Sequence, residues 1–288
     1  MNYLTPEKSY FIAELKELYE SKKVMQYYKR TDSIYYLRTN DSVSIEDVYK
    51  YPSFVQFTRF FNTMTIVDKA YNNLMTIEGG LTERHDALIE DLNTIYGVNK
   101  SNIDISGNDL KDLCLKHDDY LVENTTWYPD YAKNKLNDEI INYFLSDPYQ
   151  INDLERYKSY ALEEYAHLVS VFLTNSINSY RKIRKFLAEE RDIKQDSLYN
   201  ASGYEKYAGL YSMGEDTVEV VIEDNKLIWI YKPSDDAIVE EKVELYPILD
   251  YCFIANGGFN YFLFNKEKGE YDFLYSHLGA HYRFSKVK

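Results

Sequence analysis

Residues 218–231 read Val-Glu-Val-Val-Ile-Glu-Asp-Asn-Lys-Leu-Ile-Trp-Ile-Tyr. Val218, Val220 and Ile222 occupy every second position, which is the period of a β-strand with one buried face. Asp224-Asn225 is a dipeptide typical of tight turns, and a run of β-branched and aromatic residues follows it. The stretch therefore predicts a β-hairpin.

The same kind of pattern continues to the end of the sequence. Short strand-like runs lie at Ile238–Tyr246, Tyr251–Ala255, Phe259–Phe264, Tyr271–Leu274 and His281–Phe284. Asn256-Gly257-Gly258 and Lys268-Gly269 supply turns between them. About eight short strands in residues 204–288 predict a small antiparallel β-barrel or a strongly curved sheet.

Before about residue 198 the spacing of apolar residues changes to three or four, as in an α-helix. In Tyr160–Leu187, for example, Leu168, Val169 and Phe172 fall on one helical face. Other predicted helices are Pro6–Tyr28, Pro52–Ile77, a helix that Thr82 caps and Gly97 ends, Asp109–Val122 and Pro129–Leu145. The polar segments 99–102 and 106–108 are predicted as linkers between helices.

The change of period divides the protein into two predicted domains. Residues 1–198 form an α-helical bundle, and residues 204–288 form the small antiparallel β-barrel. The polar residues 195–203 between them are typical of a linker. The expected fold class is α+β.

The charge balance argues against a nucleic-acid partner. The sequence has 33 Lys and Arg against 47 Asp and Glu, a net charge of −14. We expect no nucleic-acid partner, because phosphate binding needs a basic surface.

The apolar runs are far shorter than the roughly 20 residues of a membrane-spanning helix, so we expect no membrane span.

The N-terminus has no basic segment followed by an apolar one, and so does not read as a signal peptide. We therefore expect a cytoplasmic protein for the sequence as it begins here. A periplasmic or envelope location is expected instead if an upstream anchor has been removed.

Motifs that carry chemistry are sparse. Cys114 and Cys252 are the two cysteines and are expected to be buried free thiols. Glu164-Tyr165-Ala166-His167 has the Glu-x-x-His spacing of di-iron bundles, but a second such motif is missing. Ser179-Tyr180-Arg181-Lys182 matches the Ser-x-x-Lys motif of penicillin-binding proteins and class A β-lactamases. The Ser-Asp-Asn and Lys-Thr-Gly motifs of those enzymes are missing from the sequence. We expect no catalytic residues, no bound metal and no cofactor.

The C-terminal part resembles a known family. The resemblance rests on Tyr207-Ala208-Gly209-Leu210-Tyr211, Val218-Glu219-Val220, Asn225-Lys226-Leu227, Leu245-Tyr246-Pro247, Phe253, Phe262-Leu263-Phe264, Gly269 and Phe284-Ser285-Lys286-Val287. This pattern is similar to the small lipocalin-like β-barrel domain appended to β-lactamase-related serine hydrolases. The resemblance implies turn glycines and inward-facing aromatic residues, and it carries over no catalytic residue.

The helical part resembles the helical domain of uncharacterised envelope proteins of Bacteroidota. The resemblance rests on the segment Ala70-Tyr71-Asn72-Asn73-Leu74-Met75-Thr76-Ile77-Glu78-Gly79-Gly80-Leu81. In that family a membrane anchor precedes the helices, and the sequence here departs from the family in lacking one.

These observations favour a non-enzymatic binding or scaffolding protein of a bacterial cell. A protein partner, or a small hydrophobic or aromatic-stacking ligand, is expected. The candidate ligand-binding residues are Trp229, Tyr231, Phe262 and Phe264. Alternation places Trp229 and Tyr231 on one face of their strand and Phe262 and Phe264 on one face of theirs, and these residues bind a ligand if both faces line the barrel interior. The abundance of large aromatic residues favours a filled barrel, in which Trp229 is a core residue. The alternative is a glycosidase-like hydrolase with an acidic site between the two domains.

Overall fold

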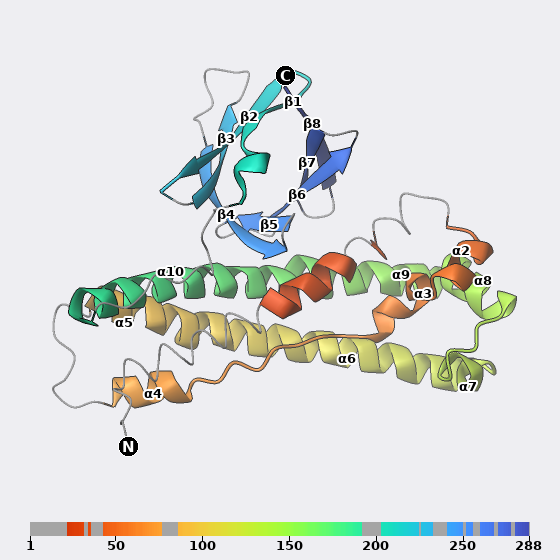
Figure 1. Ribbon diagram of the computed structural model, residues 1–288. Coiled ribbons are helices and arrows are strands. Elements are labelled where there is room, and N and C mark those ends of the chain that lie inside the picture. Colours follow the sequence, from red (N-terminus) through yellow and green to blue (C-terminus); the bar gives the residue numbers. More distant parts are fainter. Residues whose placement is uncertain are drawn as a thin grey trace. The chain divides into compact units, whose positions relative to one another are not determined.

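The computed structural model confirms the α+β fold class, with helices first and antiparallel strands after them (Figure 1). It describes residues 22–31, 34–35, 43–76, 86–191, 203–224, 226–232, 241–249, 252–255, 260–267, 270–277 and 280–287. Most of the helix predicted at Pro6–Tyr28 lies outside these residues, as does the linker predicted at 195–203 apart from Gly203. The domain boundaries predicted from the linker therefore stay a prediction.

The protein forms two compact units. One unit comprises Lys23–Ile66 and Gly97–Val169, and we call it the helical unit. The other comprises Met1–Lys22, Val67–Tyr96 and Ser170–Lys288, and we call it the barrel unit because it contains all of the described strands.

The helical unit is built from short helices around one long one. Its described elements are α2 (Ile45–Lys50), α3 (Ser53–Gln56), the 3-10 helix η1 (Phe57–Arg59), α6 (Lys100–Asn124), α7 (Tyr128–Tyr131), α8 (Asp138–Ser146), α9 (Pro148–Tyr157), the π-helix η4 (Lys158–Tyr165) and the start of α10 (Ala166–Arg191). Polar caps fix several starts: Ser44 forms a capping box with Asp47, and Asn137 and Asp147 accept hydrogen bonds from the first turns of α8 and α9.

Two predicted linkers are wrong. Residues 99–102 and 106–108 lie within or directly at the start of α6, and the predicted helix end at Gly97 falls inside the π-helix η3 (Thr94–Asn99). Gly107 faces a tight contact, since an added Cβ would lie 3.1 Å from a ring carbon of Tyr165 and 3.3 Å from Cγ2 of Thr63. The glycine at this position permits close packing against the helix and does not break it.

Two predicted helices are interrupted. The helix predicted over Pro129–Leu145 ends after α7, where Asn134 adopts φ 57°, and restarts at α8. The helix predicted over Pro52–Ile77 stops after η1, and α4 (Lys69–Met75) begins only after a non-helical segment. We call residues 60–66 of that stretch the extended segment.

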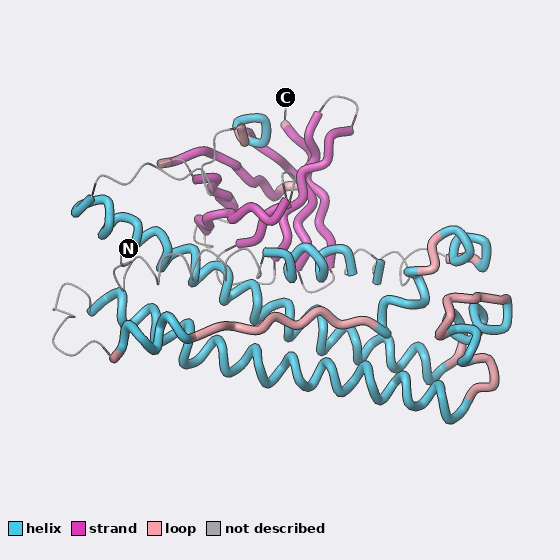
Figure 2. Tube along the Cα trace, turned by 60° about the horizontal axis from the view of Figure 1, so that its bottom comes forward, coloured by secondary structure: helices cyan, strands magenta, loops and turns pink. Residues whose placement is uncertain are grey.

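Tyrosine hydroxyl groups fix the extended segment along α6, where Figure 2 shows it as a pink tube. Tyr157 donates a hydrogen bond to the carbonyl oxygen of Phe60 (3.0 Å). The backbone N–H of Asn62 donates to the hydroxyl of Tyr28 (3.3 Å). The backbone N–H of Met64 donates to the hydroxyl oxygen of Tyr165 (2.7 Å). The three rings are at most 1 % exposed, so these contacts satisfy backbone groups that have no strand partner.

Burial also keeps these hydroxyls protonated. Desolvation raises the pKa of Tyr165 to about 12 and raises the pKa values of Tyr28 and Tyr157 as well. Each of the three hydroxyls is therefore neutral at neutral pH, so the hydrogen bonds to the extended segment place no charge in the core.

The barrel unit contains α4, α5 (Asp86–Asn93), part of η3, most of α10, the 3-10 helix η5 (Glu205–Tyr207) and the strands. The strands are β1 (Gly209–Met213), β2 (Asp216–Glu223), β3 (Lys226–Lys232), β4 (Glu241–Leu249), β5 (Cys252–Ala255), β6 (Asn260–Glu267), β7 (Glu270–His277) and β8 (Ala280–Lys286). Each pairs antiparallel with the next, and β8 pairs with β1 to close the barrel.

The hairpin predicted from residues 218–231 is confirmed. Val218 pairs with Tyr231 and Glu223 with Lys226, which leaves a two-residue turn in which Asp224 has φ 49°. This positive φ is the geometry of a hairpin turn whose twist matches the flanking strands.

The closure of the barrel also has a local cause. Gly209 has φ 148°, and an added Cβ would lie 2.5 Å from the side chain of Lys286. The Nζ of Lys286 donates a hydrogen bond to the carbonyl oxygen of Ala208 at 2.7 Å. A glycine at position 209 therefore leaves room for the lysine that ties β8 to the start of β1.

Two glycines of the same helical stretch provide a matched stability test. Gly107→Ala should lower the free energy of unfolding by about 1–3 kcal/mol, because the ring of Tyr165 is buried and hydrogen-bonded and cannot move away. Gly97→Ala should raise it by about 0.5–1 kcal/mol, because nothing lies within 4 Å of the new Cβ. Urea unfolding of the full-length protein measures both. Equal effects of the two substitutions would contradict the packing role of Gly107.

Candidate ligand cleft in the helical unit

The structure brings the aromatic residues predicted to bind a ligand together inside the barrel. Trp229, Phe262 and Phe264 are 7 %, 1 % and 2 % exposed and belong to one core cluster, against which Tyr231 packs. Trp229 meets Phe262 edge to face at 5.6 Å between ring centres. Phe264 stacks on Tyr207 of η5 at 4.5 Å. The four residues thus pack against other side chains, and Figure 1 shows the ring of strands around η5.

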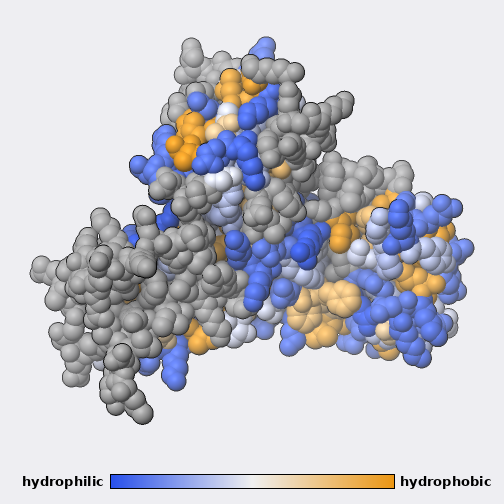
Figure 3. Space-filling model, viewed as in Figure 1, coloured by the Kyte–Doolittle hydropathy of each residue, from blue (hydrophilic) through white to orange (hydrophobic). Residues whose placement is uncertain are grey.

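A cleft lies instead in the helical unit. It has a volume of about 280 Å³ and is lined by Arg59, Phe60, Phe61, Cys114, Leu115, Asp118, Ala132 and Asn134. These residues come from the end of η1 and the extended segment, from α6, and from the loop after α7. Phe60 and Leu115 are about half exposed at 50 % and 48 %, so the cleft opens beside apolar surface. Figure 3 shows such surface over the segment that follows η1.

An ion pair crosses the cleft wall. Arg59 Nε lies 3.4 Å from Asp118 Oδ1, and both side chains are partly exposed, at 20 % and 29 %. The guanidinium group lies over the rings of Tyr131 and Tyr128, at 5.2 and 6.0 Å from their centres. The Tyr128 hydroxyl donates to Asp118 Oδ2 at 2.6 Å, which raises the pKa of Tyr128. Aromatic stacking and this hydrogen bond therefore hold both charged groups in place.

Asn134 adds an amide to the lining of the cleft. Its backbone lies in the left-handed region, which asparagine tolerates better than most residues. Its Oδ1 accepts a hydrogen bond from Gln56 Nε2 at 3.0 Å. Because the oxygen is used in this way, the amide N–H groups are the donors that remain for a ligand.

Cys114 lines the cleft as an unreactive thiol. Burial raises its pKa to about 12, and the nearby carboxylate of Asp153 adds to the effect. Nucleophilic attack needs the thiolate, which is scarce at neutral pH when the pKa is this high. Cys114 and Cys252 are both buried and free, as the sequence predicts.

A buried His–Asp pair joins α6 to α9. His117 Nδ1 is 2.7 Å from Asp153 Oδ2, and the two side chains are 1 % and 5 % exposed. Gln150 of α9 is also completely buried. No group of three or more His, Cys, Asp or Glu side chains among the described residues is arranged to hold a metal ion.

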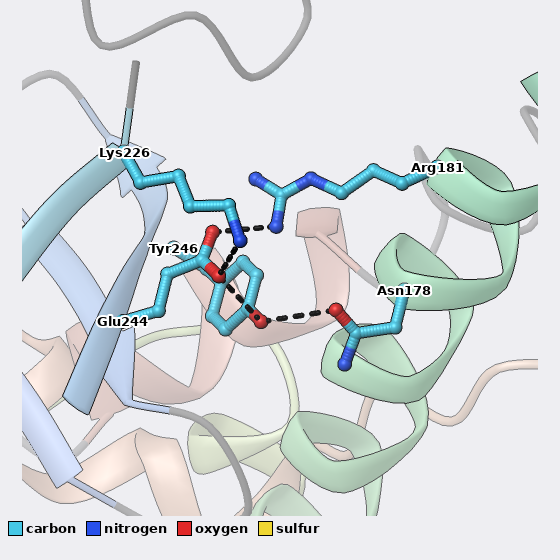
Figure 4. A network of polar contacts seen from close by, with 5 residues as sticks. All are labelled: Asn178, Arg181, Lys226, Glu244 and Tyr246. Carbon is cyan, nitrogen blue, oxygen red and sulfur yellow. Dashed lines mark hydrogen bonds and ion pairs between the residues drawn. The ribbon is translucent and has the colours of Figure 1, made fainter. Parts of the chain in front are cut away.

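The second polar network belongs to the barrel unit (Figure 4). Glu244 of β4 accepts a hydrogen bond from Arg181 of α10 at 2.5 Å, and its other oxygen lies 3.0 Å from Lys226 Nζ. Tyr246 donates to Asn178 Oδ1 at 3.2 Å. Burial, with a smaller effect of the Glu244 carboxylate, raises the pKa of Tyr246 to about 12. The network ties β3 and β4 to α10, and we interpret it as structural.

The two weak motifs do not assemble sites among the described residues. Ser179 is fully buried, whereas Lys182 is half exposed and pairs with Asp91. The serine and the lysine of the Ser-x-x-Lys motif therefore lie in different environments, the serine in the core and the lysine at the surface. His167 is half buried, and desolvation lowers its pKa.

No pattern in the sequence identifies Arg59, Asp118 and Asn134 as a site. They lie in three separate segments, and no local spacing connects them. The one available signal is Arg59-Phe60-Phe61, a cation beside two aromatic residues inside what reads as a helix.

Comparisons of the sequence and the fold with protein-family models, with curated proteins and with solved structures give no match. The resemblances to a lipocalin-like barrel and to Bacteroidota envelope proteins therefore stay predictions from motifs, as does the location. Within the part of the protein that the structure describes, no helix combines the length and the apolar character needed to cross a membrane.

Truncating Trp229 tests whether the barrel interior is packed. Trp229→Ala should lower the free energy of unfolding by about 3–5 kcal/mol, because it removes a large side chain from the core. Leu210→Ala, at a position 38 % exposed on β1, should change it by less than about 0.5 kcal/mol. Thermal and urea unfolding of the full-length protein measure both variants. Wild-type stability of Trp229→Ala, together with ligand quenching of Trp229 fluorescence in the parent protein, would instead indicate a hollow barrel.

Proposed function

We propose that the protein is a non-enzymatic binding protein that receives its ligand or partner group at the Arg59–Asp118 cleft. The observation that carries the proposal is the composition of the cleft. It combines a positioned cation, a positioned carboxylate and an amide with apolar walls that continue into exposed Phe60 and Leu115. Binding sites typically pair apolar walls with a few fixed polar groups of this kind.

The chemistry of the cleft supports binding over catalysis. Asp118 is the only acidic side chain among the described residues that line it, whereas a glycosidase needs two facing carboxyl groups. The raised pKa of Cys114 disfavours a thiolate nucleophile. The hydrolase alternative, with a site between two domains, stays a prediction from composition, and no described contact favours it.

The barrel has a supporting role in this proposal. Its aromatic interior is occupied by its own side chains, including Tyr207 from η5. The sequence-based expectation of an aromatic-stacking ligand therefore moves from Trp229 and its neighbours to the exposed Phe60 of the cleft.

A fluorescent aromatic sulfonate, 8-anilinonaphthalene-1-sulfonate, is a suitable probe of the apolar wall because its rings can pack on the exposed Phe60 and Leu115. The full-length protein should show a saturable fluorescence increase. Leu115→Glu should weaken that binding by about tenfold or more, because it replaces an apolar wall with a charge that repels the sulfonate. Titration of the probe into each variant measures the effect.

Ile105→Glu is the matched control. Ile105 lies on the same helix α6, is 59 % exposed and does not line the cleft, so its substitution should leave probe binding unchanged. Melting curves check that both variants are folded. Equal probe binding by Leu115→Glu and the parent protein would contradict the proposed function, as would equal losses in the two variants.

A further inference from the structure

We propose that the cleft binds a free α-amino acid with an apolar side chain. This inference rests on the proposed function and adds the chemical class of the ligand. A free amino acid has an ammonium group, a carboxylate and a side chain on one carbon atom. The cleft presents a carboxylate, a cation with an amide, and an apolar wall within one small volume.

The carboxylate of the ligand is matched by Arg59 and Asn134. A guanidinium group has five N–H donors in a planar fork that suits a carboxylate. The contacts of Arg59 with Asp118 and Tyr128 use only part of that fork. Asn134 adds amide donors, since Gln56 already occupies its oxygen. Stacking of Arg59 on Tyr131 holds the fork in place before the ligand arrives.

The ammonium group of the ligand is matched by Asp118. Tyr128 donates to its Oδ2, and its Oδ1 is a buried atom 3.4 Å from Arg59 Nε. A carboxylate oxygen can accept two hydrogen bonds, so Oδ2 has capacity for an ammonium donor beside Tyr128. Asp118 lines the cleft, and its side chain is 29 % exposed.

The apolar side chain of the ligand is matched by the remaining walls. Phe61 and Ala132 line the cleft together with Phe60 and Leu115, which are about half exposed. The volume of about 280 Å³ lies just below the roughly 300–1,000 Å³ typical of sites for larger ligands. The site therefore suits one amino acid better than a nucleotide or an oligosaccharide.

Charge balance selects a zwitterion over a singly charged ligand. Arg59 and Asp118 compensate each other in the free protein. A ligand with only a carboxylate would compete with Asp118 for Arg59 and leave the aspartate without its partner, and a ligand with only an ammonium group would do the reverse. A zwitterion replaces both partners at once.

Isothermal titration calorimetry of the full-length protein tests the inference with L-leucine, leucinamide and N-acetyl-leucine. Leucine should bind, and each derivative should bind about tenfold or more weakly, because each lacks one of the two charges. Asp118→Asn should weaken leucine binding and strengthen that of N-acetyl-leucine, because no carboxylate then competes with the ligand for Arg59. Arg59→Gln should weaken leucine binding and strengthen that of leucinamide, because no guanidinium group then competes with the ligand for Asp118. Ile105→Glu should behave as the parent protein.

Four results would overturn the inference. N-acetyl-leucine binding as tightly as leucine would indicate recognition of the carboxyl end of a peptide, and leucinamide doing so would indicate recognition of the amino end. No heat from leucine while the fluorescent sulfonate still binds in a Leu115-dependent manner would refute the amino-acid ligand and leave the proposed function intact. Loss of both signals would contradict the proposed function as well. The derivative series uses the parent protein, so it decides the question even if Asp118→Asn fails to fold.

Discussion

Three buried tyrosine hydroxyls hold a segment of backbone that belongs to no helix and no sheet. The extended segment needs partners for its N–H and C=O groups, since each buried polar group without one costs about 1–3 kcal/mol. Tyr157 donates to the carbonyl oxygen of Phe60, Tyr28 accepts from the N–H of Asn62, and Tyr165 accepts from the N–H of Met64. Another tyrosine acts in the same way in the barrel, where Tyr211 donates to the carbonyl oxygen of Tyr207.

The cleft depends on this arrangement. Arg59 is the last residue of η1, and Phe60 and Phe61 begin the extended segment, which the hydrogen bond from Tyr157 to Phe60 holds in place. Gly107 allows Thr63 and the Tyr165 ring to approach α6 closely enough for the contact at Met64. The cleft therefore depends on the packing of the extended segment against α6, and a substitution at Gly107 should also alter the cleft.

The barrel was predictable from the sequence because its signals are local. Alternation along 218–222 and the turn Asp224-Asn225 fix the strand face and the hairpin register without reference to distant residues. The helical unit was less predictable. Ser106-Gly107-Asn108 has the composition of a turn, yet tertiary contacts keep these residues helical. No local pattern in residues 60–66 predicts that the segment is non-helical and that distant tyrosines hydrogen-bond its backbone. The cleft was missed for the same reason, because its residues meet only through the fold.

Amide hydrogen exchange along the extended segment tests the central role of the tyrosine hydroxyls most directly. The N–H groups of Asn62 and Met64 should be protected, and those of Thr63 and Thr65, whose side chains are exposed, should exchange faster. Tyr165→Phe should remove the protection of Met64 while that of Asn62 persists through Tyr28. Uniformly fast exchange across the four residues, or unchanged protection of Met64 in Tyr165→Phe, would contradict the account.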